Sequence, residues 1–125
     1  MYFEEDDENR LEDLGSAVEL LSRKWHPRIL YLLCEEGELG FNDIKQKTGE
    51  ISGKVLTDSL KDLAERDVIE KNVISENPRR VKYSIKEKGK EIKPILDDLI
   101  DWNEKYDGER KVLVVDDEEK LADIY

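Results

Sequence analysis

The sequence has little of what catalytic, disulfide-bonded or membrane proteins depend on. It holds one cysteine, Cys34, which excludes an internal disulfide framework and a cysteine-cluster metal site. Its longest apolar run, ILYLLC over residues 29–34, is far short of the roughly 20 residues of a membrane span. It contains no nucleophile–base pair, phosphate-binding loop or ligand cluster that we would assign to an enzyme. We therefore expect no enzyme activity, no membrane insertion, no cofactor and no bound metal.

The length and the N-terminal segment indicate the number of domains and the cellular location. A chain of 125 residues predicts one domain with a short appendage. The opening MYFEEDDENR is acidic and lacks an apolar core, so it does not resemble a signal peptide. We expect a cytoplasmic protein.

The formal net charge of −11 is unevenly distributed along the chain. Residues 1–21 carry eight acids and one base, and residues 95–125 carry eleven acids and four bases. Between them, residues 22–94 carry sixteen bases and thirteen acids. A mildly basic middle flanked by acidic ends matters more for the choice of partner than the sum does.

Hydrophobic periodicity predicts mainly α-helical structure with one small β-hairpin. Helical spacing marks residues 9–22, 26–37, 38–49 and 52–66, with Pro27 in a first turn and Gly37 and Gly49 at helix ends. Ser52 is a plausible N-cap for the fourth helix. Strand-like segments follow at 68–74 and 81–85, and the helical period returns over 92–106, where Pro94 marks a kink or a late helix start. This order predicts an α+β fold of the winged helix-turn-helix type.

The helix predicted over residues 52–66 occupies the position of a recognition helix, whose N-terminal residues reach base edges in the major groove. With its leucines facing inward, its outward side is polar, and Gly53 allows a close approach to DNA. The candidate DNA-binding residues here are Ser52, Gly53, Lys54, Thr57, Asp58 and Lys61. Asp58 either accepts a hydrogen bond from a cytosine amino group or pairs with Lys54 or Lys61. The alternative for the whole face is a solvated surface without a partner.

The predicted hairpin carries two adjacent arginines near its tip, in SENPRR. A solvated turn does not require Pro-Arg-Arg, whereas arginines on a stiff loop can enter the minor groove or clamp phosphates. We therefore expect Arg79, Arg80 and Lys82, within a wing over residues 75–82, to contact DNA. Pairing of the arginines with a local acid such as Glu76 is the alternative.

These residues together resemble the HxlR-type winged-helix transcription regulators. The likeness runs from about Leu14 to Tyr106 and includes the Lys24-Trp25 pair before ILYLL, the stretch GFNDIKQKTGEISGKVLTDSLKDLAERDVI, and PRRVKYSIKEKG. It implies a dimer formed by the first and last helices, with two recognition helices on a pseudo-palindromic duplex. The apolar stripes agree, because they exceed what one small winged helix needs. The candidate dimer residues are Leu11, Leu14, Val18, Ile95, Leu99, Trp102 and Tyr106.

Three further features receive separate interpretations. Some members of this family sense electrophiles through a cysteine near the N-terminus; this chain has none there, and we expect Cys34 to be a buried small hydrophobe. We expect His26, at a helix start, to be a capping or surface residue. The tail VLVVDDEEKLADIY resembles the first strand and helix start of a receiver domain, with Asp116 and Asp117 at a weak metal-site position or a solvated turn.

The sequence thus predicts three parts: a flexible acidic segment over 1–8, a DNA-binding and dimerisation domain over 9–107, and a tail over 108–125. The predicted function is that of a homodimeric, sequence-specific regulator that binds double-stranded DNA. The alternative is a winged-helix module that binds another protein. A steep loss of binding with rising salt distinguishes DNA from a protein partner. The operator and any small-molecule effector are not specified by these residues.

Overall fold

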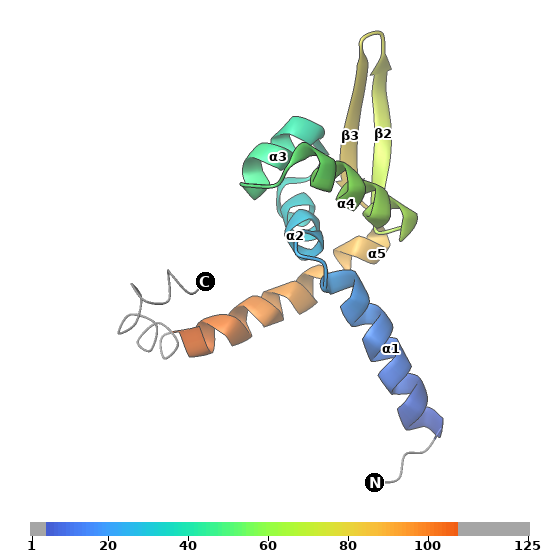
Figure 1. Cartoon of the computed structure of the whole chain (residues 1–125), viewed down its shortest axis with the longest axis vertical. Coiled ribbons are helices and arrows are strands. Elements are labelled where there is room, and N and C mark those ends of the chain that lie inside the picture. The colour runs from blue at the N-terminus through green and yellow to red at the C-terminus, as the bar shows by residue number, and fades with distance from the viewer. Residues whose placement is uncertain (1–4, 108–125) are drawn as a thin grey trace. The chain divides into compact units, whose positions relative to one another are not determined.

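The computed structural model describes residues 5–107, which form two compact units divided between Lys93 and Pro94. The first unit contains five helices (Figure 1), namely α1 (Glu5–Leu21), α2 (His26–Glu36), α3 (Phe41–Thr48), α4 (Gly53–Glu65) and α5 (Glu87–Lys90). It also contains strands β1 (Leu39–Gly40), β2 (Ile69–Glu76) and β3 (Arg79–Ile85). A last helix covers residues 93–107, so that its residues 94–107 are the described part of the second unit.

The core of the first unit lies where α2, α3 and α4 meet the base of the hairpin. Helical spacing turns one face of each helix inward, and the side chains on those faces are at most 3 % exposed. Full burial of each aliphatic side chain stabilises the fold by roughly 1.5–3 kcal/mol. The core residues are Ile29, Leu30, Leu33, Ile44, Ile51, Leu56, Leu60, Leu63, Val68 and Ile69.

The three strands form one antiparallel sheet in the order β1-β3-β2. β2 pairs with β3 from Ile69↔Ile85 to Glu76↔Arg79, with an irregularity between Val73 and Ser75. Only Asn77 and Pro78 separate the two strands. Compared with the predicted strands over 68–74 and 81–85, both strands extend further toward the tip, and the turn between them is shorter. Figure 1 shows this hairpin extending away from the helices.

The winged helix-turn-helix prediction is confirmed, and three details differ from it. β1 was not predicted, because two residues carry no periodicity and become a strand only by pairing with β3 at Leu39↔Tyr83 and Gly40↔Lys82. α1 begins at Glu5, whereas residues 1–8 were predicted to be flexible. Acidic side chains such as Asp6 and Asp7 favour this earlier start, because carboxylates stabilise a helix N-terminus. Cys34 is half-buried instead of buried.

The predicted breaks at glycine and proline are confirmed. Pro27 lies in the first turn of α2, and Gly37 follows its end at a φ of 83°, a conformation that favours glycine. The last helix starts at residue 93, so Pro94 marks a late helix start and not a kink. The receiver-like tail lies outside the described residues. Among residues 5–107, no helix combines the length and apolar character needed to cross a membrane.

Candidate nucleic-acid interface

The start of α4 is well formed for presentation to a partner. The Ser52 hydroxyl oxygen accepts a hydrogen bond from the Val55 backbone N–H at 3.1 Å, which caps the helix as predicted. Gly53 has open space where a Cβ would stand. The first turn contains no acidic residue, so its free N–H groups keep their attraction for an anion.

The outward side of α4 carries the predicted polar residues. Ser52, Lys54, Thr57, Asp58 and Lys61 are exposed, and Gly53 is half-buried. The Thr57 hydroxyl donates to the Gly53 carbonyl at 2.8 Å, and its oxygen can still accept a hydrogen bond. This set of side chains has the donors and apolar surface that base edges and phosphates require.

The structure bears on the predicted pairing of Asp58 with a neighbouring lysine. In the part of the chain that the structure describes, no ion pair joins Asp58 to Lys54 or Lys61. Asp58 instead lines a pocket of about 380 Å³ on one flank of α4, together with Arg23, Lys24 and Trp25.

The opposite flank of α4 faces the hairpin. A pocket of about 480 Å³ lies there, lined by Thr57 and Lys61 of α4 and by Lys71 and Tyr83 of the sheet. Burial raises the pKa of the Tyr83 hydroxyl, which therefore stays protonated and able to donate a hydrogen bond. Neither Lys71 nor Tyr83 was among the predicted contacts. The alternation of Val81, Tyr83 and Ile85 was the available signal, since it places Tyr83 on a single face of β3.

The predicted DNA-binding cations of the wing are exposed to solvent. Arg79, Arg80 and Lys82 are exposed. Arg79 Nη1 lies 3.6 Å from Glu76 Oε2, a pair in which both side chains are more than half exposed. Such a pair contributes at most about 1 kcal/mol, so it leaves Arg79 available to a phosphate. Arg80 forms no ion pair within residues 5–107, so pairing with local acids accounts for one arginine only.

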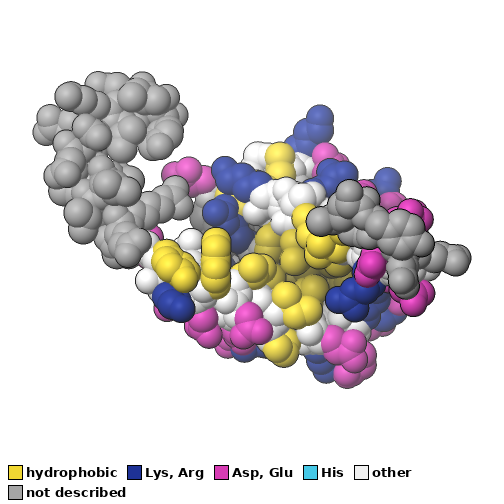
Figure 2. All heavy atoms as spheres, turned by 90° about the horizontal axis from the view of Figure 1, so that it is seen from below, with side chains coloured by type: hydrophobic (Ala, Val, Ile, Leu, Met, Phe, Trp, Pro, Cys, Tyr) yellow, Lys and Arg dark blue, Asp and Glu magenta, His cyan; other side chains and the backbone are white. Residues whose placement is uncertain are grey.

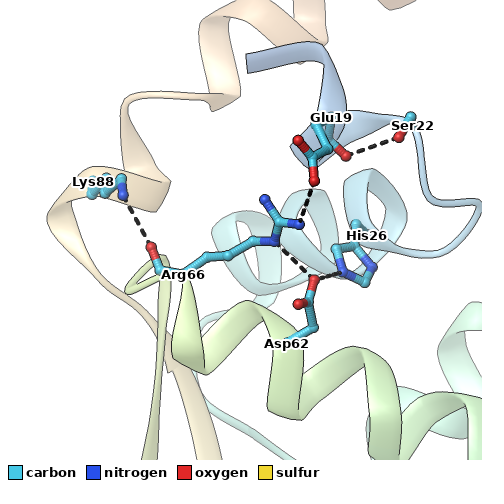
Figure 3. Close-up of polar contacts among 6 residues, drawn as sticks. All are labelled: Glu19, Ser22, His26, Asp62, Arg66 and Lys88. Atoms are coloured by element: carbon cyan, nitrogen blue, oxygen red, sulfur yellow. Dashed lines mark hydrogen bonds and ion pairs between the residues drawn. The ribbon is translucent and has the colours of Figure 1, made fainter. Parts of the chain in front are cut away.

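A polar network around the buried His26 links three helices and was not predicted (Figure 3). The His26 side chain is 2 % exposed, and its Nε2 lies 2.7 Å from Asp62 Oδ2. Arg66 Nε donates to the same oxygen at 2.8 Å, and Arg66 Nη2 lies 3.6 Å from Glu19 Oε1. The prediction of a capping or surface His26 is therefore wrong, because Asp62, 36 residues later, supplies a hydrogen-bond partner for the buried ring.

The charge of Asp62 identifies which ring nitrogen of His26 donates the hydrogen bond. The hydrogen bond from His26 and the nearby Arg66 hold the pKa of Asp62 below its usual value. Asp62 is then a carboxylate and can only accept, so His26 Nε2 carries the hydrogen. The pKa of Arg66 is raised by its hydrogen bond to Asp62. The network ties the end of α1 and the start of α2 to the recognition-helix candidate α4.

The predicted dimer residues are all exposed, and they lie on two separate elements. Their exposed fractions range from 48 % to 66 %. Leu11, Leu14 and Val18 lie on α1. Ile95, Leu99, Trp102 and Tyr106 lie on the last helix, where the rings of Trp102 and Tyr106 are 6.0 Å apart. Figure 2 shows open apolar side chains in yellow on the face that it draws.

No group of three or more metal-ligating side chains within residues 5–107 is arranged to hold a metal ion. The single histidine is engaged with Asp62.

Comparison with known proteins agrees with this geometry. Residues 20–111 match the family model of the HxlR-like helix-turn-helix. The uncharacterized HTH-type transcriptional regulator YvaP of Bacillus subtilis is 37 % identical over 86 residues, which cover 69 % of this chain and 79 % of that protein. An uncharacterized HTH-type transcriptional regulator of Methanothermobacter thermautotrophicus is 35 % identical over 100 residues, covering 80 % and 76 %.

A solved structure shows the same fold. The reduced form of the transcriptional regulator YodB from B. subtilis superposes with a TM-score of 0.68 at 29 % identity, covering 75 % of this chain and 91 % of that one. The chain therefore belongs to the HxlR-like helix-turn-helix family of transcriptional regulators.

Proposed function

We propose that this regulator is a homodimer that binds double-stranded DNA in a sequence-specific manner. In this proposal α4 lies in the major groove and the wing contacts the minor groove or the phosphate backbone. One observation carries the proposal. A capped helix with an exposed polar N-terminal face stands beside a hairpin with exposed arginines, in a chain whose two ends are acidic.

The recognition helix supplies the base contacts. Lys54, Thr57 and Lys61 are exposed on α4 and match the side chains that read guanine acceptors, thymine methyl groups and phosphates. Asp58 is exposed and free of Lys54 and Lys61, so it is available to a cytosine amino group. These contacts would give sequence preference, because they reach base edges and not only the backbone.

The wing supplies affinity without much preference. Arg80 and Lys82 are two residues apart on β3 and so lie on the same face of the strand, with Arg79 next to them at the turn. Arginine suits a narrow minor groove or a phosphate pair, and each such contact releases counterions. The acidic segments on either side of the basic middle would be repelled by DNA and would therefore face away from it.

Two exposed apolar stripes support the homodimer. Each of the seven stripe residues is about half exposed or more, and exposed apolar stripes of this kind mark interaction sites on soluble proteins. A second copy of the chain would cover them and would present two recognition helices related by two-fold symmetry. The half-sites would then be about one helical turn, roughly 10 base pairs, apart.

Fluorescence anisotropy tests this function. Wild-type protein is titrated with the duplex upstream of its own coding region and with a shuffled duplex of the same composition, over a salt series. Tight binding that prefers the native sequence and weakens steeply with salt is the expected result. Equal binding to both duplexes at every salt concentration would contradict sequence specificity and would favour a protein partner.

A further inference from the structure

Two cations lie over one tryptophan ring just before and within the start of α2, and a third cation, Arg23, precedes them in the sequence. Lys24 Nζ lies 4.9 Å from the centroid of the Trp25 ring, and Arg28 Cζ lies 4.9 Å from the same centroid. Arg23 stands next to them, and all three cations are exposed. We call Arg23, Lys24 and Arg28 the Trp25 cluster. Contact with the ring holds two long side chains in place, which reduces the entropy cost of ordering them on an anion.

The Trp25 cluster lies in a locally basic stretch of the sequence. Residues 22–34 contain three bases and no acid. No ion pair involves Arg23, Lys24 or Arg28 in the described part of the chain. The network in Figure 3 explains part of this, because Glu19 and Asp62 are already engaged by Arg66 and His26. In a protein of net charge −11, exposed cations without acidic partners indicate an anionic ligand.

The cluster stands beside the recognition helix, on the flank away from the wing. Arg23, Lys24 and Trp25 share a pocket of about 380 Å³ with Val55 and Asp58 of α4. The wing-side pocket is lined from α4 by Thr57 and Lys61. At about 100° per residue, Val55 and Thr57 point roughly 160° apart around the helix axis, so the two pockets lie on different flanks. The hydrogen bond from His26 to Asp62 fastens the cluster's own turn to α4.

A helix in the major groove has a sugar–phosphate strand on each side of it. Lys61 and Lys71 face one of those sides, at the wing. We infer that the Trp25 cluster binds the DNA phosphate backbone on the other side, as a third contact that neither α4 nor the wing provides. This inference rests on the proposed DNA-binding function. Asp58 lines the same pocket and repels phosphate, so the phosphate lies toward Arg23 and Lys24 while Asp58 faces the bases.

The salt dependence of binding tests the inference. Arg23→Gln, Lys24→Gln and Arg28→Gln are made singly and together, with Lys90→Gln on α5 as a charge-matched control. The slope of log K against log salt should fall by about 0.9 for each phosphate that the variant no longer neutralises, hence by up to about 3 in the triple variant. Affinity at about 0.15 M salt should fall at least tenfold in the triple variant. The ratio of native to shuffled duplex should stay unchanged, and Lys90→Gln should behave as wild type.

A second measurement acts on the DNA and does not depend on the stability of a variant. Single phosphates of the duplex are replaced by neutral methylphosphonates, and the affinity of wild-type and triple-variant protein is compared. Wild type should bind more weakly when certain phosphates are replaced, whereas the triple variant should be insensitive to the same replacements. Identical profiles would overturn the inference, as would an unchanged salt slope or a weakened sequence preference without a change in slope. If wild type itself shows no salt-dependent duplex binding, the proposed function fails first, and the inference fails with it.

Discussion

α1 and α4 carry similar apolar patterns and have opposite surroundings. On α4, Leu56, Leu60 and Leu63 are at most 1 % exposed. On α1, Leu11, Leu14 and Val18 recur at a comparable helical spacing and are at least 50 % exposed. Helical periodicity therefore predicts an apolar face reliably, but it does not say whether the same chain covers that face.

The difference separates two kinds of stabilisation. The α4 stripe holds the recognition helix on the rest of its own unit, so it contributes to folding at any protein concentration. The α1 stripe contributes little to stability while it is exposed to solvent. If a second copy of the chain covers it, its contribution to stability depends on protein concentration.

The largest effect is expected in the core. Leu60→Ala should lower the free energy of unfolding by about 2–5 kcal/mol, because it leaves a cavity under α4. Leu14→Ala, the matched change on α1, should cost about 0.5 kcal/mol or less in dilute protein, since its side chain is 60 % exposed. Urea unfolding followed by tryptophan fluorescence measures both. Similar destabilisation by the two variants at low concentration would contradict the contrast between the two helices.

Dissociation of the dimer is the next expected effect. Leu99→Asp on the last helix should yield monomers in light scattering, because a charge cannot be buried unpaired in an apolar interface. Glu104→Lys changes the charge at an exposed position on the opposite side of this helix from the stripe and should leave the dimer intact. A Leu99→Asp dimer as stable as wild type would reject this interface.

A moderate effect is expected at the wing. Arg79→Ala with Arg80→Ala should weaken binding to all duplexes alike, by about tenfold, and lower the salt slope by roughly 2. Lys90→Ala is the control. Anisotropy at several salt concentrations gives the affinity and the slope together. An unchanged affinity would remove the wing from the interface and leave α4 to act without it.

The smallest expected effect is a pH dependence of the stability that Asp62 contributes through the network between α1 and α4. Because the pKa of Asp62 is lowered in the folded protein, its carboxylate stabilises the fold above the ordinary carboxyl pKa of about 3.9. That contribution disappears as pH falls through the lowered value. Asp62→Asn should therefore be less stable than wild type at pH 7, and the gap should narrow toward pH 3. Urea midpoints at both pH values measure the gap, and a gap that is constant with pH would exclude an ionised Asp62.

Much of the fold was predictable because it is encoded locally. Ser52, the leucines of α4, Pro27 and Gly37 act within a few residues of themselves, and each has the predicted place in the structure. β1 was missed because its identity comes from β3, more than 40 residues later in the chain. The two strands of the hairpin were predicted too short at the tip, since Arg79 and Arg80 join β3 only through cross-strand pairing.

The candidate site was predictable in part for the same reason. Exposure of Lys54, Thr57 and Lys61 follows from the helical period of α4 alone. The His26–Asp62–Arg66 network and the pocket between Trp25 and α4 depend on how two helices pack. No spacing in the sequence signals such an approach, so His26 was misplaced and the Trp25 cluster went unrecognised.

The central claim is that two copies of α4 read two half-sites of one duplex. Selection of bound sequences from a pool of randomised duplexes, with the wild-type protein, tests it most directly. The expected result is enrichment of an inverted repeat whose half-sites are centred about one helical turn, roughly 10 base pairs, apart. Enrichment of a single unrepeated motif would contradict the dimer, and a pool that stays random after selection would contradict sequence-specific binding.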